Sequence, residues 1–546
     1  MNFTKAHWLT FATVPIAPSK KPVNYWITSP VFPLWMLSKN RYAGLLNTVK
    51  FLCKAREVFM TPTRIKIGFV PSLRGGWGPV SDWCARMREE GIRALQQIEG
   101  LELVFPRPHP EDPSAIVPES GYIPDGVVCN LDHAEAVAEY FFREKVDGIV
   151  IGALNFGDER SASKIAELLK VPVMLYATRE PPVPEGPSLA RISDSYCGTL
   201  SIAAGLYRRK LPFHFAGILL ADEPAFRHEA ETFLRAVAVV KSLKNARIGQ
   251  IGLRPSGFET VAFDEKSMIQ KFGQNVIYLD LADLVLRARD YFDEDPRLAE
   301  IAQRTRQSAA QITVAEEWIQ KAARLELAIR EFWQRARLSA MAMSCWSSIQ
   351  RMYGISVCAI FGKLTGDGLL TACEADVVGA LSMLTQRAAS LHQAVPHFID
   401  WTIQHRDHPN RFLAWHCGNA PACLAADPSR TALRSRQDML GVLPPDPCDD
   451  QAGLYQFQLR PGPVTLCRLA EYDGQWKMLI ASGEIIPSDE TLTGTWAWVQ
   501  VRDHSLLYRT LVEEGFIHHA SLIHGNQRDS LLLACKFLDI RPVIIE

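Results

Sequence analysis

The feature that most constrains the fold is a regular alternation of short apolar segments and longer amphipathic segments over residues 64–207. The short segments are too brief for helices and lack the polar–apolar alternation of half-exposed strands, so each predicts a strand buried on both faces. These strands are expected at 64–70, 101–105, 146–151 and 171–176, with helices over 79–98, 132–144 and 158–169 between them. Buried strands separated by helices predict a parallel sheet with helices on both faces.

A second α/β unit follows the Pro-rich connector at 180–187. Its apolar segments predict strands at 215–220, 246–253, 275–281 and 355–361, and helical spacing predicts helices over 225–242, 313–336 and 339–352. From about residue 390 the chain changes to short segments joined by Gly, Pro and Asp turns, at 455–459, 464–471, 476–484 and 495–501, with a terminal helix at 527–538. This pattern is typical of an antiparallel sheet or a small barrel.

The sequence thus predicts an α/β protein with domains at 60–207, 208–389 and 390–546. Residues 1–59 differ from the rest, because they carry eight basic residues and one acid and show poor periodicity. A transit peptide or a membrane-surface arm would explain this composition. We favour the simpler interpretation, a loosely ordered extension before the first domain.

Charge and hydropathy exclude several classes of protein. The 59 Lys and Arg residues nearly cancel the 60 Asp and Glu residues, and no basic stripe is present, so a nucleic-acid partner is not expected. No apolar run reaches the length of a membrane span. The twelve cysteines are scattered without a CxxC pair, which favours buried free thiols in a reducing cytoplasm over a structural zinc site.

Three segments combine polar, ligand-type residues with apolar neighbours. The first holds Glu374 and Asp376, where Asp376 is more simply a helix cap. The second holds Asp400, an acid in an apolar stretch that must be paired or coordinated, and His416, which is more often a core histidine than a ligand. The third, 515–525, holds adjacent His518 and His519, which would point to opposite faces of an extended backbone.

Taken together, two carboxylates and one or two imidazoles form a mixed oxygen and nitrogen donor set. Such a set suits Mn²⁺ and tolerates Mg²⁺, Co²⁺ or Zn²⁺. The fold would have to bring the donors together, because Glu374, Asp400 and His519 lie far apart in the chain.

The segments ACEADVVGALSM, FIDW, AWHCGNAP and FIHHASLIHG occur in the order seen in the L-fucose isomerase and L-arabinose isomerase superfamily, which the chain resembles over residues 62–546. By this resemblance Glu374 and Asp400 are metal-binding and catalytic acids, His519 is the metal-binding histidine, and His416 is a further ligand. The acid at 400 is fucose-like, whereas His416 and the His-His pair are arabinose-like, so the sugar stays open.

The resemblance also implies an architecture. Two Rossmann-like parallel-sheet domains would precede a C-terminal domain with an antiparallel β-barrel, and the active site would lie between the second and third domains. The expected assembly is a homo-oligomer in which a neighbour's first domain closes the pocket.

The activity expected is aldose–ketose isomerisation of a free sugar through an enediol, with one carboxylate moving the carbon-bound proton and the other serving the oxygens. Substrate contacts are expected from Arg74 and Trp77 in the loop after the first strand, and from Trp401, with Trp346 and Trp496 as further candidates for the pocket wall. A sugar epimerase with the same metal site, or a non-catalytic sugar-binding regulator, is the alternative. A thiol enzyme using Cys373 or Cys417 is disfavoured because neither has an evident local base.

Overall fold

The computed structural model describes residues 64–75, 82–180, 192–435 and 452–545. The predictions for residues 1–59 and for Trp77 lie outside these ranges. Among the helices in the described part of the chain, none is long and apolar enough to cross a membrane.

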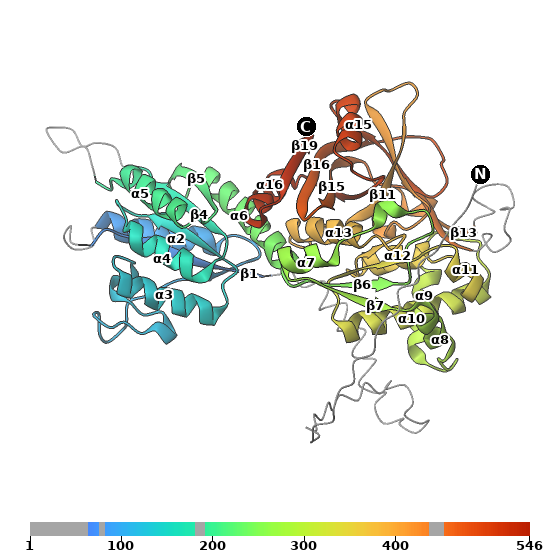
Figure 1. Ribbon diagram of the computed structural model, residues 1–546, viewed down its shortest axis with the longest axis horizontal. Helices are drawn as coiled ribbons and strands as arrows, with labels where there is room; N and C mark the ends of the chain where they lie inside the picture. Colours follow the sequence, from blue (N-terminus) through green and yellow to red (C-terminus); the bar gives the residue numbers. More distant parts are fainter. Residues whose placement is uncertain (1–63, 76–81, 181–191, 436–451, 546) are drawn as a thin grey trace, which may run out of the picture. The chain divides into compact units, whose positions relative to one another are not determined.

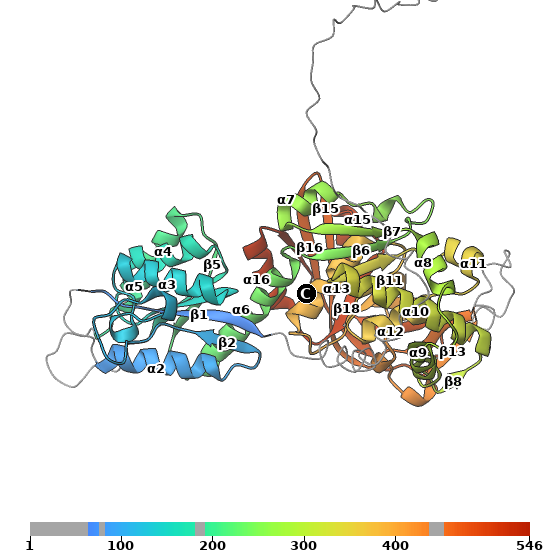
Figure 2. The same cartoon turned by 90° about the horizontal axis from the view of Figure 1, so that it is seen from below.

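The first sheet, in which Figure 1 labels β1, β4 and β5, has five parallel strands in the order β2-β1-β3-β4-β5. The alternating pattern predicts four of these strands, β1 to β4. The strands are β1 (Ile65–Ser72), β2 (Leu101–Val104), β3 (Gly148–Ala153), β4 (Val173–Thr178) and β5 (Phe213–Leu219). Helices α3 (Leu131–Glu144), α4 (Glu159–Leu169) and α5 (Ser195–Arg208) pack on one face, and α2 (Asp82–Gln96) and α6 (Pro224–Leu243) on the other (Figure 2). Coverage of both faces explains why β3 and β4 are buried at every residue.

Strand β5 differs from the prediction, which assigned residues 215–220 to the second unit. Its residues pair in parallel with β4, with Val173 opposite Phe213 and Thr178 opposite Leu219. The chain crosses from β4 to β5 through α5, and such a crossover returns the next strand to the same sheet. The first sheet therefore extends past residue 208, and residues 181–187 of the predicted connector lie outside the described residues.

The second sheet has four parallel strands in the order β10-β9-β6-β7. Its strands are β6 (Arg247–Ile251), β7 (Asn275–Leu279), β9 (Ala340–Met343) and β10 (Thr371–Ala372). The helices in this part of the chain are α7 (Glu265–Phe272), α8 (Leu281–Arg289), α9 (Pro296–Arg306), α10 (Glu316–Ala336), α11 (Ser348–Tyr353), α12 (Cys358–Gly366) and α13 (Val377–Ala389). Helix α10 confirms the helix predicted at 313–336.

Two predictions in this unit are wrong. Residues 355–361 form a short segment and the start of α12 instead of a strand, and residues 339–352 contain strand β9 and part of α11 instead of one helix. In both cases the apolar run is short, and periodicity alone cannot separate a buried strand from a buried helical segment of that length.

The third sheet is mixed and has ten strands in the order β19-β16-β15-β18-β11-β12-β17-β14-β13-β8. The strands predicted from the turn-rich pattern are β14 (Ala452–Gln458), β15 (Gly462–Tyr472), β16 (Gln475–Ile486) and β17 (Thr495–Gln500). The others are β8 (Gln311–Ile312), β11 (His397–Gln404), β12 (Arg411–His416), β13 (Ala432–Ser435), β18 (His519–His524) and β19 (Arg541–Ile545). Helices α15 (His504–Glu513) and α16 (Arg528–Leu538) complete this part, and α16 confirms the predicted terminal helix.

Helix α13 lies between the second and third sheets and is buried along its whole length (Figure 1). It contacts β9 and β10 of the parallel sheet, and β15 and β18 of the mixed sheet. Gly379 permits the close approach to β11, since a Cβ there would lie 2.5 Å from a ring carbon of Phe398. The helix thus brings the loop at its amino end to the residues of β11 and β18.

Candidate metal and sugar site

Glu374 lies in the tight loop between β10 and α13. Glu374 and Ala375 both adopt left-handed backbone angles, with φ of 53° and 55°, which non-glycine residues rarely do. The loop is held by the amide of Ala375, which donates to the carbonyl of Met343 at 3.1 Å, and by Asp376, which caps α13 by accepting from the amide of Gly379 at 2.8 Å. Strained backbone of this kind persists where the surrounding structure fixes it, often at functional sites.

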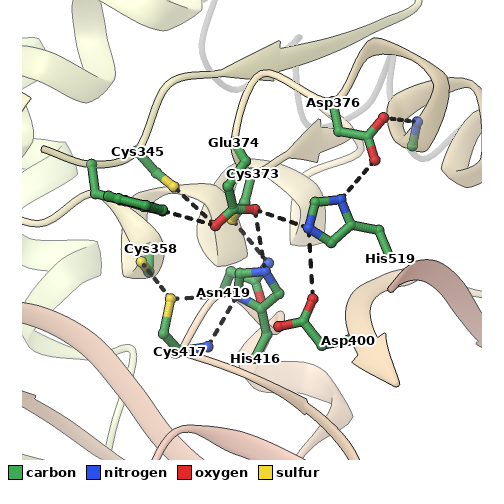
Figure 3. A network of polar contacts seen from close by, with 12 residues as sticks. Cys345, Cys358, Cys373, Glu374, Asp376, Asp400, His416, Cys417, Asn419 and His519 are labelled. Carbon is green, nitrogen blue, oxygen red and sulfur yellow. Dashed lines mark hydrogen bonds and ion pairs between the residues drawn. The ribbon is translucent and has the colours of Figure 1, made fainter. Parts of the chain in front are cut away.

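The predicted metal-site residues come together from four separate elements (Figure 3). Asp400 on β11 lies opposite His519 on β18 and opposite Trp415 on β12, the residue before His416. Glu374 Oε2 lies 3.6 Å from His416 Nε2 and 3.5 Å from His519 Nε2. Asp400 Oδ1 lies 3.6 Å from His519 Nε2. The residues that the sequence spreads over 374–519 therefore face one another.

Three of these polar atoms are buried but have no hydrogen-bond partner among the described residues. Within the described residues, Glu374 Oε2, Asp400 Oδ1 and His416 Nε2 accept or donate no hydrogen bond. Separations of 3.5–3.6 Å are too long for good hydrogen bonds. Donors about 2.1 Å from one ion are themselves about 3.0–3.4 Å apart, so a small contraction around a cation would satisfy these atoms.

His519 is oriented by Asp376 and Arg468. Its Nδ1 lies 2.8 Å from Asp376 Oδ2, so Nδ1–H donates to the carboxylate and Nε2 presents its lone pair to Glu374 and Asp400. Arg468 of β15 donates to both oxygens of Asp376, and these two side chains are 4% and 0% exposed. The sequence predicts only a capping role for Asp376, and the structure gives this residue a second role in orienting His519. The partnership with Arg468 had no sequence signal.

His416 presents a proton to the site. Its Nδ1 accepts from the amide of Cys417 at 3.0 Å, so the neutral ring carries its proton on Nε2. Burial disfavours the charged ring, but Cys417, Asp400 and Glu374 outweigh it and raise the pKa of His416 well above its usual value. Cys417 Sγ also lies 3.4 Å from Nδ1, so this thiol has the local base that the sequence did not reveal.

The two carboxyl groups have unequal environments. Burial raises the pKa of Glu374, but the facing His416 and His519 outweigh burial and hold that pKa at about 2. Burial raises the pKa of Asp400 above its usual value, and the two histidines only partly oppose this. Pairs of titratable groups with such opposed shifts are the usual basis for separate acid and base roles.

His518 departs from the expectation that it points away from His519. It lies in a bend before β18 begins at His519, so the extended geometry behind that expectation does not hold. The two imidazole rings are 4.1 Å apart, and ring nitrogens of both lie within 4.8 Å of a carboxylate oxygen of Asp400. His518 is therefore an exposed neighbour of the same site.

Aromatic side chains lie beside Glu374 and His518. The indole N–H of Trp346 donates to Glu374 Oε1 at 3.3 Å, and Phe258, in the loop after β6, packs against both Trp346 and His518. Trp401 packs on Phe412, and its indole nitrogen is buried without a described partner. Trp496 instead packs with Leu413 and Trp498 in a separate apolar cluster.

Arg74 lies at the carboxyl end of β1, in the first sheet. Its amide donates to Asn155 Oδ1 at 2.9 Å, its Nε donates to the carbonyl of Gly157 at 3.1 Å, and its guanidinium lies over the Phe156 ring. These contacts hold Arg74 to the loop after β3. Its role in substrate binding stays a prediction, as does that of Trp77.

Comparison with known proteins agrees with this geometry. The family model of the N-terminal domain of fucose/sulfoquinovose isomerase matches residues 110–244, and that of the C-terminal domain of L-fucose isomerase matches residues 414–546. A sulfoquinovose isomerase of Alkalicoccus urumqiensis is 28% identical over 403 residues, which cover 73% of this chain and 86% of the relative. A sulfoquinovose isomerase of Priestia aryabhattai is 26% identical over 77% of this chain and 90% of its own length. One of Clostridium sp. (strain MSTE9) is 25% identical over 73% of this chain and 86% of its own length. The chain is thus similar to the L-fucose isomerase-like family in two separate regions, and it is an isomerase of the intramolecular oxidoreductase class.

Proposed function

We propose that the protein is a metal-dependent aldose–ketose isomerase in which Glu374, Asp400 and His519 hold the divalent ion. One observation carries this proposal. The buried Glu374 Oε2 and Asp400 Oδ1, which have no hydrogen-bond partner among the described residues, converge on the Nε2 lone pair of His519. Two carboxylates and one imidazole suit Mn²⁺ and also accommodate Co²⁺ or Mg²⁺. For His416, the fourth ligand of the sequence-based set, the proton on Nε2 favours a hydrogen-bond donor to substrate.

A divalent ion bound there would act as a Lewis acid on the carbonyl and the adjacent hydroxyl of the sugar. Asp400 is the better candidate to remove the proton from the carbon next to the carbonyl and return it to the former carbonyl carbon. Its side chain is 25% exposed, against 8% for Glu374, and its raised pKa suits a group that must hold a proton. Glu374, which stays ionised, and the Nε2–H of His416 then serve the transfer between the two sugar oxygens.

The substrate class is proposed from the relatives, which are named sulfoquinovose isomerases. We propose a hexose that carries a sulfonate on the carbon farthest from the carbonyl. Retention of the acids at 374 and 400 and of His519 favours the isomerase over the alternative of a non-catalytic sugar-binding regulator.

Turnover assays on purified protein test this function. The panel is sulfoquinovose, glucose, L-fucose, D-arabinose and L-arabinose, each after chelation and again after addition of Mn²⁺, with products identified by NMR. We expect Mn²⁺-dependent formation of the ketose from sulfoquinovose. Products epimeric at one carbon would identify an epimerase instead, and full turnover after chelation would contradict metal dependence.

We further propose that strands β16, β15, β18, β11, β12 and β17 form a closed antiparallel barrel. Support comes from the additional antiparallel pairing of β16 with β17, which links the two ends of this run of strands. Apart from β5, which pairs with the first sheet, we propose the domain limits at 60–207, 208–389 and 390–546, and a homo-oligomeric assembly. Light scattering with size-exclusion chromatography would measure the assembly, and a monomer at working concentration would contradict it.

A further inference from the structure

The two oxygens of Glu374 face different kinds of side chain. Oε2 faces the imidazoles of His416 and His519, as described above. Oε1 instead accepts from the thiol of Cys345 at 3.4 Å and from the indole of Trp346 at 3.3 Å. One carboxylate therefore stands between a nitrogen-rich side and a sulfur-rich side (Figure 3).

The sulfur side contains two thiols brought together by the second sheet. Strands β9 and β10 run in parallel, with Ala342 opposite Ala372, and Cys345 and Cys373 lie in the loops where these strands end. One donor atom each of Cys345, Cys373 and Glu374 lies within 4.8 Å of the others. These residues are only 2%, 0% and 6% exposed, so the cluster is enclosed by protein.

We propose that Cys345, Cys373 and Glu374 Oε1 form a second metal site, which takes a thiophilic divalent ion such as Zn²⁺ or Cd²⁺. Sulfur donors select soft ions over Mn²⁺ and Mg²⁺. Metal–sulfur bonds of about 2.3 Å place two sulfurs of a tetrahedral site about 3.8 Å apart, which donor atoms within 4.8 Å of one another can reach with small side-chain shifts. On binding, each thiol releases its proton to solvent, two metal–sulfur bonds and one metal–oxygen bond form, and nothing is oxidised or reduced.

The two proposed sites share Glu374, so an ion bound at the second site would affect the first. A soft ion bound through Oε1 would draw the carboxylate toward the sulfurs and place a second positive charge beside the proposed Mn²⁺ ligands. Thiophilic ions should therefore inhibit turnover even when Mn²⁺ is in excess. This consequence rests on the proposed function, whereas the existence of the site does not.

The test uses Cd²⁺ on the full-length, chelator-treated protein, without substrate. Cadmium–thiolate bonds give an ultraviolet charge-transfer absorption, so binding is measured directly and does not depend on activity. We expect one equivalent of Cd²⁺ to produce this absorption in the wild type. Binding should weaken at least tenfold in Cys345→Ala and in Cys373→Ala. The matched control is Cys535→Ala, since Cys535 is also fully buried but contacts Met478 on β16, and this variant should bind as the wild type does.

X-ray absorption on Cd²⁺-loaded wild type provides a measurement that needs no variant to fold. Two sulfur neighbours per cadmium are expected. Three results would overturn the proposal: unchanged absorption in both the Cys345 and Cys373 variants, an equal loss of absorption in the Cys535 variant, or a sulfur count of zero or four. A protein that shows the cadmium–thiolate absorption but turns over none of the sugars would keep this site and refute the proposed function, so the two failures are distinguishable.

Discussion

The pair formed by Asp376 and Arg468 gives the sharpest prediction, because Asp376 both caps α13 and orients His519. In Asp376→Asn the cap is preserved, since Asn and Asp are equivalent at this position, and the shape is unchanged. The negative charge is lost, and Arg468 is left as a buried cation whose side chain is only 4% exposed. Removing one partner of a buried ion pair costs about 3–5 kcal/mol of unfolding free energy. Because the amide oxygen of Asn can still accept from Arg468, we expect a loss near the lower value, about 3 kcal/mol.

Hydrogen exchange followed by mass spectrometry is the suitable assay, because a chain of several structural units need not unfold in one step. A loss of about 3 kcal/mol corresponds to exchange roughly 10²-fold faster in peptides that cover α13 and β15. The matched control is Asp264→Asn, which changes the cap of α7, where the side chain accepts from Ser267. Its effect should stay within about 0.5 kcal/mol.

The pH dependence has a fixed sign. Burial raises the pKa of Asp376, but Arg468 and His519 outweigh it and hold the pKa below its usual value. A group with a lowered pKa in the folded state stabilises the fold above its unfolded-state pKa of about 4, and this contribution is lost as the pH falls through the folded-state pKa. The difference in unfolding free energy between wild type and Asp376→Asn should be constant near neutral pH and should become smaller below about pH 4. Equal exchange in Asp376→Asn and Asp264→Asn would refute the reasoning.

Asp376→Asn should also weaken Mn²⁺ binding about 10–100-fold in calorimetry, because it removes the group that orients His519. Asp400→Asn should lower kcat by about 10²–10⁴-fold with a smaller change in KM, and a normal kcat would remove Asp400 from the proton transfer. His416→Leu should lower kcat by about tenfold or more but leave Mn²⁺ affinity unchanged, whereas lost affinity would show that His416 is a ligand. Lys363→Met removes one of two cations paired with the buried Glu326, whose Oε2 lies 2.6 Å from Lys363 Nζ while its Oε1 keeps Arg330, and should cost about 1–3 kcal/mol in differential scanning calorimetry. The exposed pair lost in Lys241→Met should cost less than about 1 kcal/mol, and equal shifts of the two melting temperatures would contradict this account.

Much of the architecture was predictable because burial on both faces leaves a strong pattern. Strands β1, β3 and β4 are nearly continuous apolar runs, and the turns around β14–β17 mark antiparallel strands. The pattern is ambiguous where an apolar run is short, as at residues 355–361, which contain the start of α12. It is also silent where strand pairing is nonlocal, as for β5. Pairing partners depend on contacts between distant segments, which local patterns do not encode.

The residues of the candidate site also differ in how far the sequence predicts them. Glu374, Asp400 and His519 stand out because acids and histidines are unusual inside apolar stretches, and the family resemblance assigned their roles. The residues that hold them were not visible, since Arg468 lies in an ordinary strand pattern and Asp376 already had an explanation as a cap. The thiols of Cys345 and Cys373 are 28 residues apart and meet only because β9 and β10 are neighbours, so no spacing motif exists.

The central claim is that three side chains from separate elements hold one divalent ion. The most direct measurement is anomalous X-ray scattering at the manganese absorption edge from crystals of the Mn²⁺-loaded protein. We expect a single strong peak about 2.1–2.2 Å from a carboxylate oxygen of Glu374, a carboxylate oxygen of Asp400 and Nε2 of His519. A peak that contacts none of these three atoms, or no peak at saturating Mn²⁺, would contradict the account.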